Sequence, residues 1–305
     1  MAQSFPHKLP GEHVYDGVLF FGYSPPEVLD RVKTFPVRED DVFIVTYPKA
    51  GTTWLQELLW LLMHDGDFKG ASETPLYLRS PFIEFKDDIL GEDGFELARA
   101  MDSPRVIKSH LQHRFMPDEL EHKDCKVVVL FRNPKDVLTS YFHFYRCSSS
   151  FGQFRGSWAE FFDMFLAGHV DHGSWFDFTE SWWSQRDREN VKICFYEDFQ
   201  EDLTSELSRL AEFLGKGHLA ANVLSRIADH CSFSSMKKNP MTNHLDVYSI
   251  NSDISPLLRK GQVGDWRRHF TVEQSEVFDM KLASKLGHLA IPFRYELPQQ
   301  PSAQP

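Results

Sequence analysis

The chain has 305 residues, of which 42% are hydrophobic and 25% are charged, and its formal net charge is −11. This composition is typical of a globular protein and not of a disordered one. The acidic balance argues against a nucleic-acid-binding protein, which usually carries a basic face. An anionic ligand would therefore need a local cluster of positive side chains.

The cysteines and the apolar runs of the sequence indicate the cellular compartment of the protein. The four cysteines have no disulfide-like or metal-like spacing, which favours a reducing compartment: Cys125, Cys147, Cys194 and Cys231. The first residues lack the layout of a secretory signal, and the longest apolar run, 54–63, is too short to cross a bilayer. We therefore expect a cytoplasmic protein without a membrane partner. No metal is expected, because no further ligand completes the pair His169 and His172 beside Asp171.

Apolar runs alternate with helical patterns along the chain. Strands are predicted at residues 42–47, 105–109, 126–131 and 191–196, and unbroken apolar runs are typical of strands buried on both faces. Helices are predicted at 53–63, after Asn133, at 203–214 before Gly215, and from the capping-box pair Thr271 and Gln274 to Gly287. This alternation predicts an α/β fold with a central parallel sheet flanked by helices on both faces.

A phosphate-binding loop is predicted where the first strand meets its helix. Residues 47–54 read Tyr-Pro-Lys-Ala-Gly-Thr-Thr-Trp. Backbone N–H groups at a helix start favour an anion, and Gly51 allows the chain to approach a ligand closely. Lys49 adds a charge, although it precedes the glycine by two residues, so the motif is not Walker A. An ordinary strand–turn–helix corner would contain the same residues.

A second cationic position follows the strand at 126–131. Arg132 lies at its carboxyl end, where ligands gather in parallel sheets, and the guanidinium fork suits phosphate oxygens. Taken alone, Arg132 is better explained by a surface salt bridge. The adjacent Arg259 and Lys260 are likewise explained by a solvated loop.

Three segments carry a resemblance to a known family. Residues 46–54 closely resemble the 5′-phosphosulfate loop of the cytosolic sulfotransferases, with Ala50 where the family usually has Ser. Residues 132–141 resemble the 3′-phosphate site of that family, and residues 257–266 resemble its second signature. The segments occur in the family's order and at its separations, so the resemblance covers roughly residues 35–293.

The resemblance implies a P-loop-like loop that binds the donor PAPS (3′-phosphoadenosine 5′-phosphosulfate), whose product is PAP (3′,5′-adenosine bisphosphate). Tyr196 and residues 231–236 resemble the family's adenine-side segments, with Cys231 where Thr is common. The implied nucleotide-binding residues are Lys49, Ala50, Gly51, Thr52, Thr53, Trp54, Arg132, Ser140, Tyr196, Cys231, Ser232, Phe233, Met236, Leu258, Arg259, Lys260 and Gly261.

The resemblance also implies a catalytic base. Residues 108–110, Lys-Ser-His, resemble the Lys-Thr-His of the family, whose His takes the proton of the acceptor. The implied reaction is in-line transfer of a sulfuryl group to a hydroxyl or amine, with PAP leaving. His110, Lys49 and Lys108 are the implied catalytic residues, and an unperturbed imidazole suits a base at neutral pH. Without the resemblance, a single His after a strand is more often structural.

Aromatic residues mark the expected acceptor pocket. Residues 81–85 and 141–145 resemble the family's acceptor segments, and ring-lined pockets prefer hydrophobic ligands. Core packing explains each ring equally well, and phenols, steroids, other alcohols and amines all remain open as acceptors. We expect one domain, 1–305, with residues 1–35 extending over this pocket and a frayed tail at 298–305. The expected acceptor contacts are Phe21, Phe82, Phe85, Lys108, His110, Phe144 and Tyr248.

The sequence also allows a homodimer and two alternative functions. The family's dimer motif, with Arg in place of Lys, fits four residues that an ordinary helix start explains as well: Arg267, Thr271, Val272 and Glu276. A P-loop-type small-molecule kinase would share the strand–loop–helix arrangement, but the Walker A motif is missing. A non-catalytic PAP- or PAPS-binding homologue would not need Lys49, Lys108 and His110 together.

Overall fold

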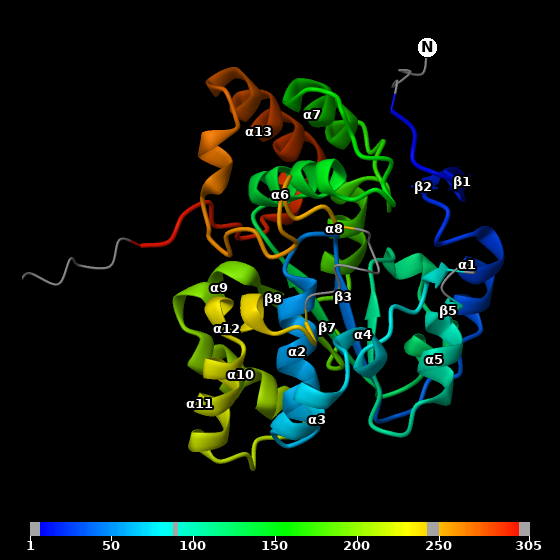
Figure 1. Ribbon diagram of the computed structural model, residues 1–305, viewed down its shortest axis with the longest axis vertical. Helices are drawn as coiled ribbons and strands as arrows, with labels where there is room; N and C mark the ends of the chain where they lie inside the picture. The colour runs from blue at the N-terminus through cyan, green and yellow to red at the C-terminus, as the bar shows by residue number, and fades with distance from the viewer. Residues whose placement is uncertain (1–6, 88–90, 243–249, 299–305) are drawn as a thin grey trace, which may run out of the picture.

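A parallel sheet forms the centre of the protein, whose structure is a computed structural model that describes residues 7–87, 91–242 and 250–298. All neighbouring strands of this sheet are parallel, and helices lie on both of its sides (Figure 1), which confirms the predicted fold class. The order of its strands is β6 (Val106–Ser109), β3 (Val42–Thr46), β7 (Lys126–Phe131) and β8 (Val191–Phe195).

The predicted strands agree with these bounds to within one residue. Tyr47 falls outside β3 because its carbonyl accepts a hydrogen bond from the N–H of Ala50, which turns the chain. Tyr196 falls outside β8 because it begins helix α9 (Tyr196–Glu201). Val45 lies opposite both Ser109 and Val129, so the carboxyl ends of β6, β3 and β7 meet at one edge of the sheet.

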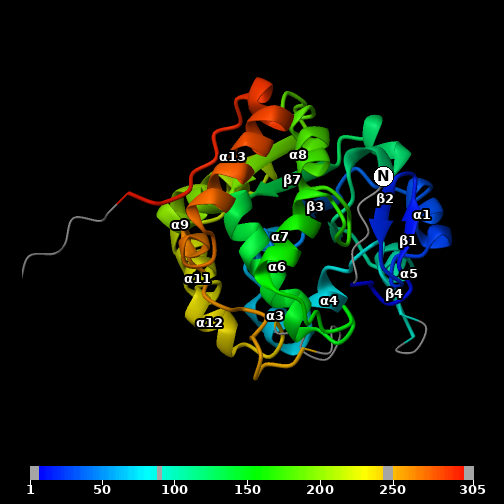
Figure 2. The ribbon, with the colours of Figure 1, turned by 90° about the horizontal axis from the view of Figure 1, so that it is seen from above.

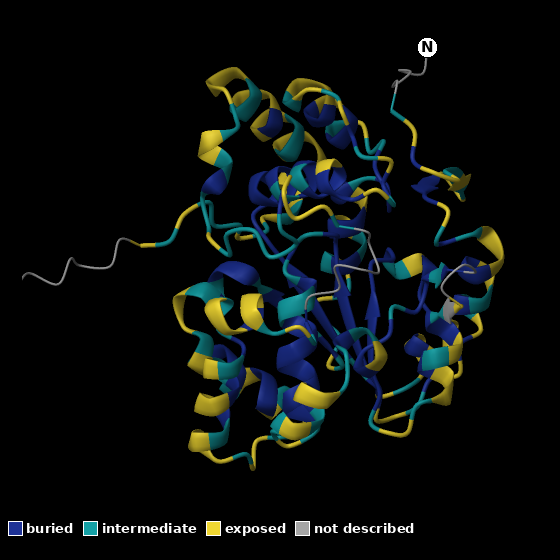
Figure 3. Cartoon of the chain, viewed as in Figure 1, coloured by how far each residue is buried: buried dark blue, intermediate teal, exposed yellow. Residues whose placement is uncertain are grey.

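Each face of the sheet carries its own apolar cluster, because successive strand residues point to opposite sides. Val42 and Ile44 share a cluster with helices α2 (Thr52–Met63), α10 (Leu203–Phe213) and α11 (Ala221–His230). Phe43 and Val45 share the other cluster with α1 (Pro26–Lys33), α6 (Pro134–Cys147), α7 (Trp158–Leu166), α8 (Trp175–Trp183) and α13 (Val272–Leu286). The strands are therefore buried while the outer helix faces are exposed (Figure 3).

Several short elements complete the part of the chain that the structure describes. Two antiparallel pairs are β1 (His13–Tyr15) with β2 (Val18–Phe20) and β4 (Lys86–Asp87) with β5 (Glu92–Asp93). The remaining helices are α3 (Phe68–Glu73), α4 (Leu76–Arg79), α5 (Gly94–Ala100), α12 (Phe233–Lys238), η1 (His113–Phe115), η2 (Asp118–Glu121), η3 (Asp265–Arg268) and η4 (Gly287–Leu289). The β1–β2 pair and α1 lie across the molecule from α9 and α12 in both ribbon views (Figures 1 and 2).

Helix termini follow the predicted capping residues. Asn133 accepts hydrogen bonds from the N–H groups of Lys135 and Asp136, which starts α6 directly after β7. Thr271 and Gln274 form a capping box at the start of α13. These caps satisfy N–H groups that the first helical turn leaves unpaired, so the capping residues mark where these two helices begin.

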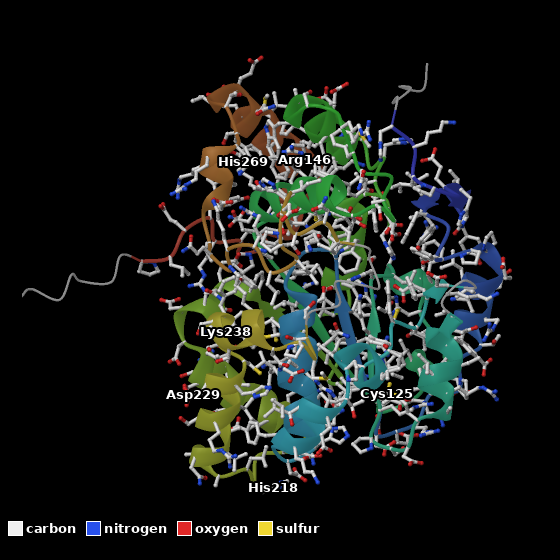
Figure 4. All side chains as sticks on the ribbon, in the orientation of Figure 1. Cys125, Arg146, His218, Asp229, Lys238 and His269 are labelled. Carbon is white, nitrogen blue, oxygen red and sulfur yellow. The ribbon has the colours of Figure 1, made fainter. Side chains whose placement is uncertain are left out.

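A buried ion pair fixes the amino end of the sheet. Arg105 precedes β6 and donates from Nε and Nη2 to Asp41 at 2.7 and 2.5 Å, and both side chains are almost fully buried. Cys125 directly precedes β7, just as Arg105 directly precedes β6, so both residues lie at the amino end of the sheet. Cys125 lies across the molecule from His269 (Figure 4). The pair therefore anchors the edge of the sheet that is far from its carboxyl ends.

We predict that Arg105→Ala destabilises the protein strongly, because it leaves the carboxylate of Asp41 buried without its partner. The expected loss in free energy of unfolding is about 3–5 kcal/mol, measured by urea denaturation. Lys69→Ala is the control, because Lys69 and Glu73 form an exposed pair that contributes roughly 0.3–0.5 kcal/mol. Equal effects of the two substitutions would contradict this account.

Candidate active site

A cavity opens at the carboxyl ends of the parallel strands, where the sequence predicted the ligand. It is lined by the loop from β3 to α2, the ends of β6 and β7, helices α6 and α12, and residues 257–262. The predicted site residues on its wall are Phe21, Lys49, Gly51, Thr52, Thr53, Trp54, Phe82, Lys108, His110, Arg132, Ser140, Phe144, Tyr196, Phe233, Met236, Leu258, Arg259, Lys260 and Gly261. Segments more than 200 residues apart in the chain thus share one cavity.

The loop from β3 to α2 has no room for a side chain at Gly51. Gly51 has a φ of 117° and is the N-cap of α2, and a Cβ built there would lie 2.9 Å from the Tyr196 ring. Lys49 also adopts a left-handed φ, of 71°. The hydroxyls of Thr46 and Thr52 lie 2.6 Å apart, which ties the end of the strand to the first residue of the helix. The unpaired N–H groups of α2 therefore face the cavity over a tight turn.

Lys49 is a buried cation on this loop. Its Nζ lies 4.2 Å from the centre of the Phe144 ring. Burial lowers the pKa of Lys49 to about 8, and the positive charges of Lys108 and Arg132 act in the same direction. An anion in the cavity would relieve this cost, because it would favour the charged amine.

Arg132 links two walls of the cavity. Its guanidinium donates to the carbonyls of Lys49 at 3.1 Å and Gln262 at 3.2 Å, and it lies 4.3 Å above the Tyr196 ring. Its buried Nε has no hydrogen-bond partner among the described residues. Among the described residues, the hydrogen bonds of Arg132 go to backbone carbonyls and not to a carboxylate, and its Nε N–H is left for a ligand.

The loop at 257–262 brings two further cations to the cavity. Arg259 and Lys260 contact the carboxylate of Asp265 at 2.6 and 2.5 Å. Asp136 on α6 accepts hydrogen bonds from the N–H groups of Gly264 at 2.7 Å and Trp266 at 2.9 Å. These carboxylates hold the loop beside α6.

His110 follows β6 and is oriented by the first strand. Its Nδ1 lies 2.7 Å from the carbonyl of Thr46, so Nδ1 carries the proton and Nε2 is left as the acceptor nitrogen when the ring is neutral. Burial lowers the pKa of His110 well below its ordinary value, and the charges of Lys108 and His172 lower it further. Burial also lowers the pKa of Lys108, to about 8. The ring is therefore uncharged at neutral pH, as a base must be.

Some predicted residues do not line the cavity. Ala50 is buried in the core, and Phe85 packs behind Phe82 at a ring separation of 6.0 Å. Cys231 supports the wall only through its backbone carbonyl, which accepts a hydrogen bond from Nε1 of the wall residue Trp54 at 2.8 Å. Ser232 caps α12. Tyr248 lies outside the described residues.

Other wall residues were not predicted as site residues. They include Phe151, Gln200, Asp171 and His172, which come from the segments after α6, in α9 and between α7 and α8. No strand end or loop motif marks these positions in the sequence. The cluster of His169, Asp171 and His172 is the sequence feature that could have indicated this part of the wall, but its spacing was interpreted as a candidate metal site. Among the described residues no group of His, Cys, Asp and Glu side chains is arranged to hold a metal ion.

A sulfotransferase family model matches residues 39–290 and is described as "Sulfotransferase domain". Sulfotransferase 1C2 of Rattus norvegicus is 39% identical over 269 residues, which cover 88% of this chain and 90% of the relative. Sulfotransferase 1 family member D1 of Mus musculus is 37% identical over 284 residues, which cover 92% of this chain and 95% of the relative. The chain is therefore an enzyme of the transferase class. It belongs to the sulfotransferase family, as its motifs predicted.

Solved structures agree with this assignment. Mouse sulfotransferase SULT7A1, complexed with PAP, has a TM-score of 0.75 and 34% identity, with 90% of this chain and 95% of that chain covered. Retinol dehydratase, in a complex with retinol and PAP, has a TM-score of 0.82 and 26% identity, with 91% and 90% covered. Over the residues that the structure describes, no helix is both long and apolar enough to cross a membrane.

We predict that Gly51→Ala weakens binding of PAP by roughly tenfold or more, because the new Cβ strains the left-handed turn and meets Tyr196. Gly17→Ala is the matched control, since Gly17 has a φ of 80° but open space around it. Titration calorimetry measures the affinity for PAP. Equal affinities in the two variants would show that the close approach at Gly51 is unimportant.

Proposed function

We propose that the protein transfers a sulfuryl group from PAPS to a hydroxyl or amine of a small hydrophobic acceptor and releases PAP. The observation that carries the proposal is that Lys49, Arg132 and His110 line one cavity. The family membership supports the reaction class, and the complex of the mouse sulfotransferase with PAP supports the identity of the nucleotide.

The cavity fits a doubly anionic nucleotide at one end. The backbone at Gly51 turns with a φ of 117° at the cavity wall, and Arg132 and Arg259 each have a buried Nε without a partner among the described residues. We assign the 5′-phosphosulfate to the turn with Lys49, Thr52 and Thr53. The 3′-phosphate goes to the second cationic wall, formed by Arg132, Ser140, Arg259, Lys260 and Gly261, because forked donors suit phosphate oxygens. Trp54, Tyr196, Phe233, Met236 and Leu258 would surround the adenosine.

The chemistry takes place beside the turn, where His110 and Lys108 would meet the 5′-phosphosulfate. His110 accepts the proton of the acceptor at Nε2 as the acceptor oxygen or nitrogen forms its bond to sulfur. The bond from sulfur to the bridging phosphate oxygen breaks in line, and that oxygen leaves with PAP. Lys49 offsets the charge that develops on the leaving oxygen, and Lys108 holds the transferring group. PAPS supplies the activated sulfuryl group, while these residues orient it and move the proton.

The acceptor end is hydrophobic. The rings of Phe21, Phe82, Phe144 and Phe151 line it beside His110. Rings with few polar groups favour a flat or apolar acceptor that carries a single hydroxyl or amine. The structure of retinol dehydratase contains retinol, and another contains androsterone, in a comparable fold. These complexes support a hydrophobic alcohol as the acceptor class.

We predict that His110→Ala lowers kcat by about 10²–10⁴-fold, because the proton of the acceptor loses its base. His218→Ala is the control, since His218 is exposed and lies at the bottom of Figure 4. Transfer from labelled PAPS to a panel of phenols, steroids, other alcohols and amines measures the rate, and calorimetry checks that PAP binding is retained.

Three outcomes would contradict the proposal. Unchanged turnover in His110→Ala would exclude the base. Tight PAP binding without transfer to any acceptor by the unmodified protein would favour a non-catalytic homologue. Phosphorylated acceptor from ATP and magnesium would favour a kinase.

We also propose that the protein forms a homodimer through the start of α13. Thr271, Val272 and Glu276 of the family motif lie there, while Arg267 lies in the preceding η3, and Val272 is 77% exposed. Met280 is 65% exposed two turns further along the same helix. Exposed apolar side chains of this kind favour a partner surface, and a second copy of the chain fits the motif.

We predict that Val272→Glu converts the dimer to a monomer, because it buries a charge at the interface. Sedimentation at micromolar concentration measures the mass. Val14→Glu is the control, since Val14 is 68% exposed on β1, away from α13. A monomer in the unmodified protein would remove the dimer hypothesis.

We also propose that the protein is cytoplasmic and that residues 1–305 form a single domain. The four cysteines are free and buried, which suits a reducing compartment. Both apolar clusters pack on one sheet, and Phe21 from the expected N-terminal extension lines the acceptor end of the cavity.

A further inference from the structure

A buried Asp–His pair lies beside His110 without a part in the proposed reaction. Asp171 and His172, in the turn between α7 and α8, are 2% and 3% exposed and line the cavity. Nδ1 of His172 lies 2.8 Å from the carboxylate of Asp171. Hydroxyls of α6 fix the turn, since Tyr145 accepts from the Asp171 N–H and Tyr141 donates to its carbonyl.

Glu84 connects this pair to the backbone of His110. Its carboxylate is fully buried and accepts from the N–H of His110 at 2.5 Å and from the hydroxyl of Ser109 at 3.3 Å. The same oxygen lies 3.6 Å from Nε2 of His172. Among the described residues, Nε2 of His172 has no closer hydrogen-bond partner, so His172 lies between two carboxylates.

The charges of this cluster require a cation at its centre. Two buried carboxylates without a compensating charge would be very costly. Burial alone would lower the pKa of His172, but the charges and hydrogen bonds of Asp171 and Glu84 raise it to about 9. The position of the ring between two carboxylates and this raised pKa both favour the imidazolium form of His172 at neutral pH. Lys108 is the other cation that acts on both carboxylates.

The imidazolium is close enough to act on the base. The rings of His110 and His172 are 5.3 Å apart and nearly perpendicular, and both contact Phe82. A positive charge at this distance disfavours a second one on His110. Lys108 and Lys49 also face His110 and act in the same direction, whereas the carboxylate of Glu84 lies at its backbone N–H.

We propose that Asp171, His172 and Glu84 form a buried charged cluster that positions His110 and keeps its imidazole neutral. Glu84 holds the peptide N–H of His110, and His172 supplies the positive charge. The inference rests on the proposed function, in which His110 is the base. His172 and Glu84 are positioning residues in this account, since they act through His110.

Two substitutions should shift the pH profile of kcat/KM in opposite directions. The acid limb of this profile reports the pKa of the base in the free enzyme. His172→Gln removes the positive charge, so the pKa of His110 rises and the acid limb moves up by roughly one pH unit or more. Glu84→Gln keeps an oxygen for the His110 N–H but removes a negative charge, so the limb moves down.

A structural role alone would lower kcat equally at all pH values in both variants. That result, or movement of both limbs in one direction, would overturn the proposal. Thermal unfolding of each variant separates loss of fold from loss of charge.

Histidine titration by NMR tests the cluster without turnover and without a variant. In ¹⁵N-histidine-labelled unmodified protein, the imidazole of His172 should stay protonated above neutral pH while that of His110 stays neutral. A neutral His172 at pH 7 would overturn the inference even in an active enzyme. A charged His172 in a protein that transfers no sulfate would instead contradict the proposed function alone.

Discussion

The close approach of Gly51 to Tyr196 is the contact on which the rest of the site depends. No side chain fits at Gly51, because a Cβ there would lie 2.9 Å from the ring of Tyr196, the first residue of α9. The ring is held in turn under the guanidinium of Arg132. The turn, the start of α9 and the wall at Arg132 therefore meet at one contact, so a change in one of them affects the others.

The same cavity also buries two lysine side chains, which lowers their pKa values. Lys49 and Lys108 have pKa values lowered to about 8, mainly by burial, because the cavity withdraws them from water. Such positions are unfavourable without an anion and favourable with one. An acidic protein with a net charge of −11 can thus bind a polyanion, because the positive charge is gathered at one end of one sheet.

The strands and the loop at 47–54 could be predicted because each is encoded locally. Unbroken apolar runs specify strands buried on both faces, and a glycine before a helix specifies the turn. Asp171 and His172 could not be placed, because their position depends on tyrosines of α6 that contact the turn after α7. Cys231 shows the converse: its segment was predicted, yet its side chain points into the core and only its carbonyl contacts Trp54.

Thr46 joins the two halves of the site. Its hydroxyl lies 2.6 Å from that of Thr52 at the start of α2, and its carbonyl accepts from Nδ1 of His110. The last residue of β3 therefore contacts both the turn before α2 and the His110 ring, and it fixes the tautomer of that ring. Since β3 is buried between β6 and β7, neither half can shift without the other. The proposed in-line transfer would need this rigidity, because the attacking and leaving atoms must lie on opposite sides of one sulfur.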